Sequence, residues 1–170
     1  MTSTEPTTRA ARTRTTSWED PMIAVQAARG RSGLELMQAL VRGEFPPPPI
    51  AETLGFRLRD VAEGDVTFVL DPGEHLYNPI GSVHGGAYAT LLDSACGCAV
   101  HTMLPEGVGY TSLDLTVKFL GAIRADTGPV LCRGTVTHLG RRTALAEATL
   151  KTVDGRLLGT ASSSCLILTP

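Results

Sequence analysis

The sequence contains no apolar run of about 18 residues, the length that a membrane-spanning helix needs. It has no apolar signal-peptide core near its start either. Lys and Arg number 15 against 17 for Asp and Glu, so the formal net charge of −2 provides no electrostatic footprint for nucleic acid. From these absences we expect a cytoplasmic protein that binds neither membrane nor nucleic acid.

Cysteine pairs of the CxxC type are also missing, although the chain has four cysteines, Cys96, Cys98, Cys132 and Cys165. Cys96 and Cys98 stand two residues apart on a predicted helix, so their side chains point about 200° apart and cannot share a metal ion. We expect buried free thiols in a reducing compartment, and no metal or other cofactor.

The start of the chain differs in composition from the rest. Residues 1–18 are rich in Thr, Arg and Ser and carry almost no apolar side chains, which predicts a disordered tail. An organelle transit peptide is the alternative, and Glu5 argues weakly against it. We expect N-terminal helices and a connector over 19–49, and the main domain over 50–170.

Two short helices are predicted before the main domain. Pro21 suits the first position of a helix, and Ser32 with Glu35 forms a capping-box pattern that predicts a helix over 34–42. The proline-rich stretch FPPPPI at 45–50 is predicted to be a stiff, extended connector with no helix.

The main domain combines strand patterns with one long helix pattern, at 87–103. The strand patterns lie at 54–61, 64–71, 111–120, 130–138, 143–153 and 156–168. The only long apolar helix must cover the apolar face of the sheet. We therefore predict an α+β fold in which a curved antiparallel sheet of about six strands wraps around one central helix.

Asp93 is the single charge in this apolar helix, and no Lys or Arg occurs over 80–116. A buried carboxylate without a basic partner costs stability, so its presence favours a general base or a nucleophile in an interior cleft. The alternative is that Asp93 faces solvent on a narrow polar strip, or accepts hydrogen bonds from a helix cap or a serine.

The sequence before the helix reads His84-Gly85-Gly86, with Asn78 six residues before the histidine. Glycines leave backbone N–H groups sterically open, and a helix N-terminus combines free N–H donors with partial positive charge. These groups can stabilise an anion or a developing oxyanion.

The spacing between the two features predicts an oligomer. Gly85 and Asp93 are eight residues apart, which is about 12 Å along a helix axis. An oxyanion donor and an attacking group must both lie about 3 Å from one reacting centre. If both residues are catalytic, Asp93 of one subunit should serve Gly85 of another, which predicts a homodimer with shared active sites.

The stretch NPIGSVHGGAYATLLDSA at 78–95, followed by TSLDL at 111–115, resembles the signature of hotdog-fold acyl-CoA thioesterases of the phenylacetate-degradation (PaaI-like) branch. The resemblance extends over about 50–168. It implies hydrolysis of an acyl-CoA to a free acid and CoA. It also implies dimers that pair through the strand near 113–119, and often tetramers.

The resemblance also implies roles for single residues. The N–H of Gly85 would polarise the thioester carbonyl, while Asn78 and His84 would hold that carbonyl and the departing thiolate. Asp93 of the partner would activate water or attack directly, and Ser112 would position the water. Candidate residues for binding the substrate and its phosphates are Gly86, Thr111, Arg141 and Arg142, with Lys118 and Arg124 as further basic groups. For each basic group, a solvated surface charge is the alternative. One departure is Gly97, where some relatives carry a threonine.

Two other function classes remain open. One is a hotdog acyl-CoA hydratase or dehydratase, although the histidine-containing patterns of those enzymes are missing. The other is a non-catalytic acyl-CoA-binding protein, which would leave Asp93 unexplained. The sequence has no serine nucleophile elbow and no P-loop.

Overall fold

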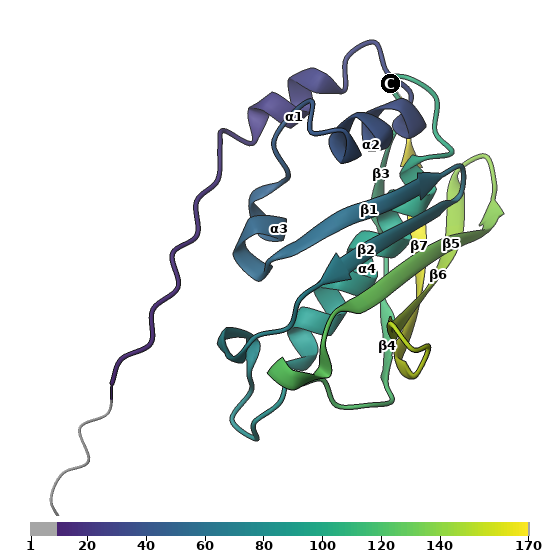
Figure 1. The fold of residues 1–170 in the computed structure, drawn as a ribbon. Helices are drawn as coiled ribbons and strands as arrows, with labels where there is room; N and C mark the ends of the chain where they lie inside the picture. The colour runs from purple at the N-terminus through teal and green to yellow at the C-terminus, as the bar shows by residue number, and fades with distance from the viewer. Residues whose placement is uncertain (1–9, 170) are drawn as a thin grey trace, which may run out of the picture.

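A curved antiparallel sheet wraps around the helix α4 (Gly85–His101) in the computed structural model, which describes residues 10–169 (Figure 1). The sheet has seven strands in the order β1-β2-β5-β6-β7-β3, and β4 also pairs with β7. The strands are β1 (Phe56–Ala62), β2 (Asp65–Leu70), β3 (Gly109–Ser112), β4 (Thr116–Phe119), β5 (Val130–Leu139), β6 (Thr143–Thr152) and β7 (Leu157–Leu168). The predicted α+β fold with one long central helix is confirmed.

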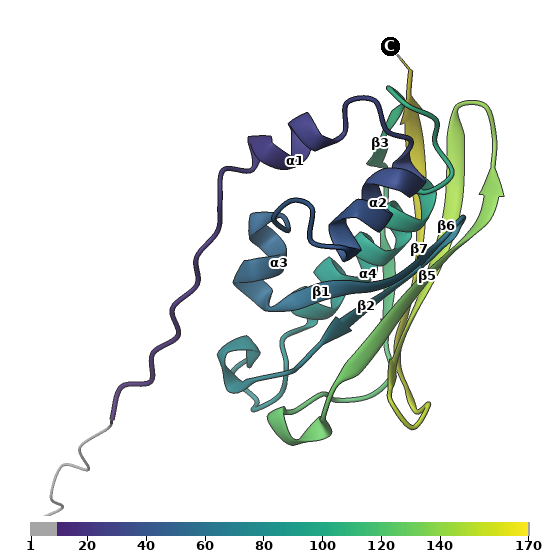
Figure 2. The same cartoon turned by 45° about the horizontal axis from the view of Figure 1, so that its top comes forward.

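Small residues on the sheet let α4 lie close to it. Buried alanines alternate with exposed residues along β6, so one face of the strand packs on the helix. On β5, a Cβ atom at Gly134 would lie 2.1 Å from the carbonyl oxygen of Ala95, so any larger residue would push the helix away. Figure 2 shows the sheet curving along the length of α4.

The segment predicted as one strand, 111–120, is two strands because it contains a bulge. Ser112 pairs with Cys165 and Thr116 pairs with Ser162, so three residues of this segment face two residues of β7. The carboxylate of Asp114, inside the bulge, accepts hydrogen bonds from the N–H (3.1 Å) and the hydroxyl (2.6 Å) of Ser164. The prediction of one continuous strand is therefore wrong, and Leu113 and Phe119 are exposed.

The N-terminal helices α1 (Met22–Ala27) and α2 (Gly33–Val41) lie near their predicted positions. The capping box of α2 is confirmed: the Ser32 hydroxyl accepts the N–H of Glu35 (3.3 Å) and the Glu35 carboxylate accepts the N–H of Ser32 (2.8 Å). The Ser32 hydroxyl also donates to this carboxylate at 2.8 Å, and the two bonds that the carboxylate accepts from Ser32 lower the pKa of Glu35.

The proline-rich connector was predicted without helix, and this is wrong at its end, where α3 (Pro49–Leu54) begins. Proline fits the first turn of a helix because its missing N–H would have no partner there. Two short 3₁₀ turns, Glu74–Leu76 and Ala125–Thr127, complete the elements.

The predicted tail lies partly outside the described residues, which start at 10. Residues 10–20 form no helix or strand, yet the Arg14 guanidinium donates to the carbonyl oxygens of Thr53 (2.5 Å) and Glu52 (3.3 Å) at the end of α3. Arg12 also pairs with Glu74 at 2.6 Å. These contacts hold the segment against the domain.

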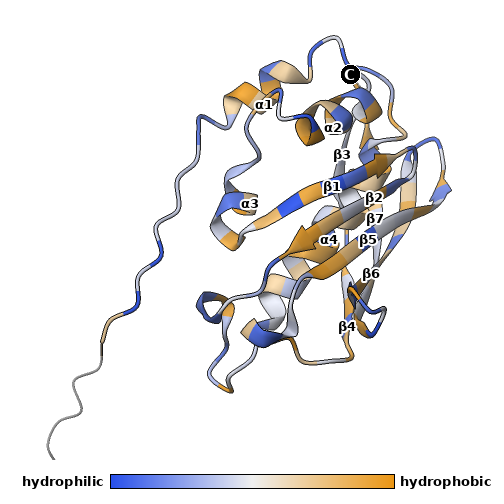
Figure 3. Cartoon of the chain, viewed as in Figure 1, coloured by the Kyte–Doolittle hydropathy of each residue, from blue (hydrophilic) through white to orange (hydrophobic). Residues whose placement is uncertain are grey.

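The core consists of two clusters. The main cluster lies between α4 and the sheet, and a smaller one forms around Leu36, Met37, Ala39 and Phe45. Figure 3 colours much of β2 and α2 as hydrophobic, in agreement with these clusters. Within residues 10–169, no helix combines the length and the apolar character required to cross a membrane.

Candidate active site

The start of α4 presents one backbone donor without an acceptor. His84 is the N-cap, and its Nδ1 accepts the N–H of Gly86 at 2.8 Å. The N–H of Gly86 was expected to be open to a ligand, and this is wrong. In the part of the chain that the structure describes, the N–H of Gly85 has no hydrogen-bond acceptor. Because Nδ1 of His84 accepts, the neutral ring carries its proton on Nε2, which can donate to a ligand.

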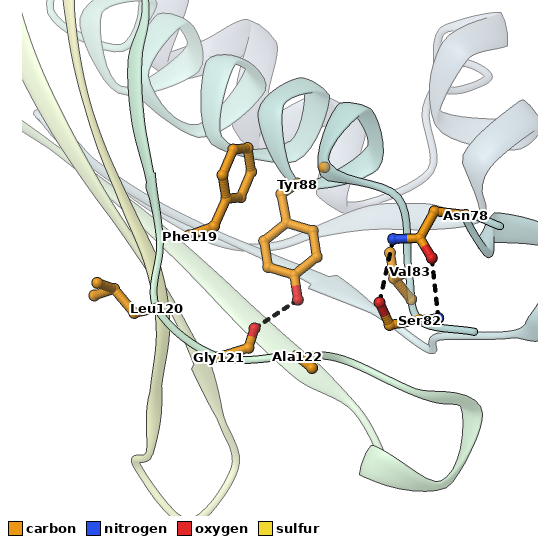
Figure 4. A pocket seen from close by; sticks show the side chains of 9 residues that line it. Asn78, Ser82, Val83, Tyr88, Phe119, Leu120, Gly121 and Ala122 are labelled. Carbon is orange, nitrogen blue, oxygen red and sulfur yellow. Dashed lines mark hydrogen bonds between the residues drawn. The ribbon is translucent and has the colours of Figure 1, made fainter. Parts of the chain in front are cut away.

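The loop before α4 is fixed by Asn78. Its Oδ1 accepts the N–H groups of Ile80 (3.0 Å) and Ser82 (3.2 Å), and its Nδ2 donates to the Ser82 hydroxyl (3.2 Å). Figure 4 shows these bonds between Asn78 and Ser82. One hydrogen on Nδ2 is left for a ligand. Asn78 therefore shapes the loop and retains one donor.

A pocket of about 410 Å³ opens at this helix start. Its lining residues are Asn78, Ser82, Val83, Gly85, Tyr88, Phe119, Leu120, Gly121 and Ala122. The pocket therefore brings together Asn78 and Gly85, two of the predicted site residues. Their neighbours Ser82, Tyr88 and Phe119 were missed, although Ser82 lies inside the quoted motif and Tyr88 follows Gly85 by one turn.

Two aromatic rings form one wall of this pocket (Figure 4). The Tyr88 hydroxyl donates to the carbonyl of Gly121 at 2.7 Å, and the Tyr88 and Phe119 rings meet edge to face at 5.6 Å. A Cβ atom at position 85 would lie 3.0 Å from Cζ of Phe119. A side chain at this position would therefore press on the exposed ring of Phe119, which would have to shift by a few tenths of an ångström.

Asp93 lies two turns further along α4 and does not line this pocket. Its side chain is half-buried rather than fully buried, and its carboxylate accepts the Ser112 hydroxyl at 3.0 Å. The serine hydrogen bond that the sequence left as an alternative is therefore present. Ser112 ends β3, so this predicted residue lies with Asp93, while the side chain of Thr111, one residue earlier in the strand, points to the opposite face.

The paired arginines lie at the same end of the sheet as Asp93. Arg141 and Arg142 are exposed in the turn between β5 and β6. Thr143, after that turn, and Thr111 both pair with Leu166, so they are two strand spacings apart, roughly 10 Å. Of the other basic candidates, Lys118 is exposed on β4 and Arg124 follows the pocket residues Gly121 and Ala122.

Tyr110 occupies the space beside Gly97. A Cβ atom at Gly97 would lie 2.6 Å from the Tyr110 hydroxyl, and burial raises the pKa of that phenol well above its usual value.

Burial also raises the pKa values of Cys96 and Cys98 to about 12, so neither thiol is a nucleophile at neutral pH. All four cysteines are free. Among the described residues, no three His, Cys, Asp or Glu side chains gather as a metal site.

Known proteins are similar to this chain in sequence. The sequence model of the family described as "Thioesterase superfamily" matches residues 80–158. A protein of Halobacterium salinarum named "Putative esterase" is 30% identical over 119 residues, which are 67% of this chain and 77% of that protein. The chain belongs to the thioesterase superfamily.

Solved structures agree with this thioesterase assignment. A phenylacetic acid degradation-related protein from Ralstonia eutropha JMP134 is 30% identical with a TM-score of 0.69, and the match covers 76% of this chain and 98% of that one. A Streptococcus mutans protein bound to acetyl CoA is 21% identical with a TM-score of 0.61, and the match covers 67% of this chain and 89% of that one. This second likeness is one of fold alone. The PaaI-like resemblance is thus confirmed, and membership of this superfamily supports a hydrolase.

Proposed function

We propose that this thioesterase-superfamily member hydrolyses an acyl-CoA to a free acid and CoA, at sites that each combine residues of two subunits. The N–H of Gly85 polarises the thioester carbonyl. Asn78 and His84 contact that carbonyl and the departing thiolate through Nδ2 and Nε2. Asp93 of the partner subunit, positioned by Ser112, acts on the carbonyl carbon.

The chemistry requires no group beyond these residues and water. Asp93 takes a proton from water as the water oxygen bonds to the carbonyl carbon, or attacks that carbon directly with its carboxylate. In the second case the loss of CoA leaves an acyl-aspartyl anhydride, which water then hydrolyses to the free acid and the regenerated aspartate. The carbonyl oxygen becomes an oxyanion that accepts the Gly85 N–H. The carbon–sulfur bond then breaks, and the thiolate of CoA leaves and takes up a proton.

The observation that carries the proposal is the unpartnered N–H of Gly85 at the pocket of α4. The Asp93–Ser112 pair lies about 12 Å further along the same helix, too far to act on a carbonyl bound there. Three large apolar residues are exposed at the edge formed by β3 and β4: Leu113 directly after β3, Phe119 at the end of β4, and Leu120 directly after it. This exposure favours pairing of two subunits at this edge. A dimer of dimers is compatible with this edge.

The acetyl CoA seen in the Streptococcus mutans structure supports CoA as the carrier group. We place the CoA phosphates near Arg141 and Arg142, which are exposed, and the rest of the substrate near Gly86 and Thr111. Lys118 and Arg124 are further basic contacts. The free thiols agree with a location in the cytoplasm, and no metal or cofactor enters the reaction.

The test is thiol release by the purified protein from a panel of short, medium and aryl acyl-CoAs. We expect release from at least one of them at a rate far above the uncatalysed reaction. Tight binding of acyl-CoA without release would favour the non-catalytic binding protein. A change in enoyl-CoA absorbance without thiol release would favour the hydratase.

A further inference from the structure

A second cavity, of about 390 Å³, lies under the N-terminal helices and does not include the residues around Gly85. Its walls come from α1, α2, the Phe45–Ala51 segment, β1, β2 and α4, and include Leu36, Met37, Phe45, Phe56 and Phe68. Figure 2 shows α2 and α3 on the same side of β1 as α4. This volume falls in the range of small-molecule sites, roughly 300–1,000 Å³.

The cavity presents carbon surface to a ligand. Its one charged lining residue is Arg57, whose guanidinium pairs at 3.1 Å with the exposed Asp71. The hydroxyl of Ser94, which also lines the cavity, donates to the carbonyl of Thr90 at 2.8 Å. Because its polar groups already have partners, the cavity favours a hydrocarbon over a phosphate or a sugar.

Helix α4 contributes both to the wall of this cavity and to the proposed reaction centre. Ser94 and Cys98 of α4 line it, and Ser94 directly follows Asp93. The Cys98 thiol is protonated at neutral pH because burial raises its pKa to about 12, so it contributes only apolar contact. α4 thus carries the acid next to the side chains that form the cavity wall.

We propose that this cavity binds the hydrocarbon tail of the acyl group whose thioester reacts at Asp93. The inference rests on the proposed function and adds its substrate class: a medium-length aliphatic acyl chain, rather than an acetyl group. Helices α2 and α3, which lie outside residues 80–158 matched by the family model, form one wall of this cavity.

The decisive variant fills the cavity from α1. Ala24 lines the cavity and Ala27 does not, although both are half-buried on the same helix and pack against the small cluster. Ala24→Phe should therefore narrow the cavity, and Ala27→Phe controls for the added ring. Val41→Trp, at a residue that lines the cavity and is 43% exposed, is a second variant if Ala24→Phe does not fold.

The readout is kcat/KM for acetyl-, hexanoyl- and decanoyl-CoA. For the wild type we expect a value at least about tenfold higher with decanoyl-CoA than with acetyl-CoA, because each buried methylene favours binding about fourfold. Ala24→Phe should lower the decanoyl value at least about tenfold and leave the acetyl value within about twofold. Ala27→Phe should change neither.

Two outcomes separate the proposals. Hydrolysis with a flat chain-length profile, or equal losses in Ala24→Phe and Ala27→Phe, would overturn the cavity assignment and leave the thioesterase function intact. If no CoA ester is hydrolysed, calorimetric titration with decanoic acid decides. Binding weakened by Ala24→Phe alone would support the cavity, and no binding would overturn it.

Discussion

Gly85 is confined by the residues on both sides of it. Phe119 packs where a side chain would begin, and His84, with φ −64° and ψ 140°, directs the chain into the helix. This backbone conformation of His84 is the one that a residue before proline adopts. Proline also suits the first position of a helix. The backbone at Gly85 therefore accepts a proline, which removes the N–H that the mechanism uses.

We expect Gly85→Pro to lower kcat by about 10²- to 10³-fold, the usual effect of losing one oxyanion donor. Gly85→Ala is the matched control, because it introduces the same contact with Phe119 and keeps the N–H. Steady-state thiol release with both variants measures the difference. Equal activities of the two variants would show that the N–H has no role and that the contact alone matters.

The roles predicted for the site residues stay predictions, and the structure shows which of these residues lie together. Asn78 and Gly85 share a pocket, while Ser112 contacts Asp93 from 19 residues away. Which N–H of the Gly-Gly pair is free could not be predicted, since it depends on the ring orientation of His84. The cavity under α2 was also missed, because its walls come from six separate parts of the chain.

The elements with local signals were predicted well. The capping box fixed the start of α2, and the apolar pattern located α4 to within two residues at each end. The bulge between β3 and β4 was missed because its cause lies in the partner strand, where Ser164 bonds Asp114. Likewise α3 was missed because four prolines concealed a helix that starts at the last of them.

The end of α4 should make the stability of the fold depend on pH. Burial lowers the pKa of His101 below its usual value of 6.5, and its ring lies 5.5 Å from that of Tyr110. As pH falls through about 6.5, the unfolded chain takes up a proton that folded His101 accepts only at lower pH. The free energy of unfolding should therefore fall between pH 7 and pH 5.

Urea unfolding of the wild type and of His101→Gln at both pH values tests this. The variant should lose less stability on acidification, and the remaining loss includes His75, whose pKa is also lowered, mainly by burial. Equal losses in the two proteins would rule out His101 as a source of the effect.

On the scale of the whole molecule, the proposed mechanism divides the site into two half-sites at different places along α4. It assigns carbonyl binding to the residues around Gly85, and it assigns the acid, its serine and the cavity proposed for the acyl tail to the region of Asp93. The edge formed by β3 and β4, with its exposed Leu113 and Phe119, is the surface through which a second subunit would join them. A complete site then belongs to the dimer.

The most direct test combines two inactive chains. Asp93→Asn and Gly85→Pro chains, co-expressed with different tags and purified as the mixed dimer, each lack one half-site. In a shared-site dimer, one site contains both defects and the other contains neither, so the mixed dimer should show about half the wild-type kcat per dimer. If both groups of a site came from the same chain, the mixed dimer would be no more active than its two parents, and that result would contradict the shared site.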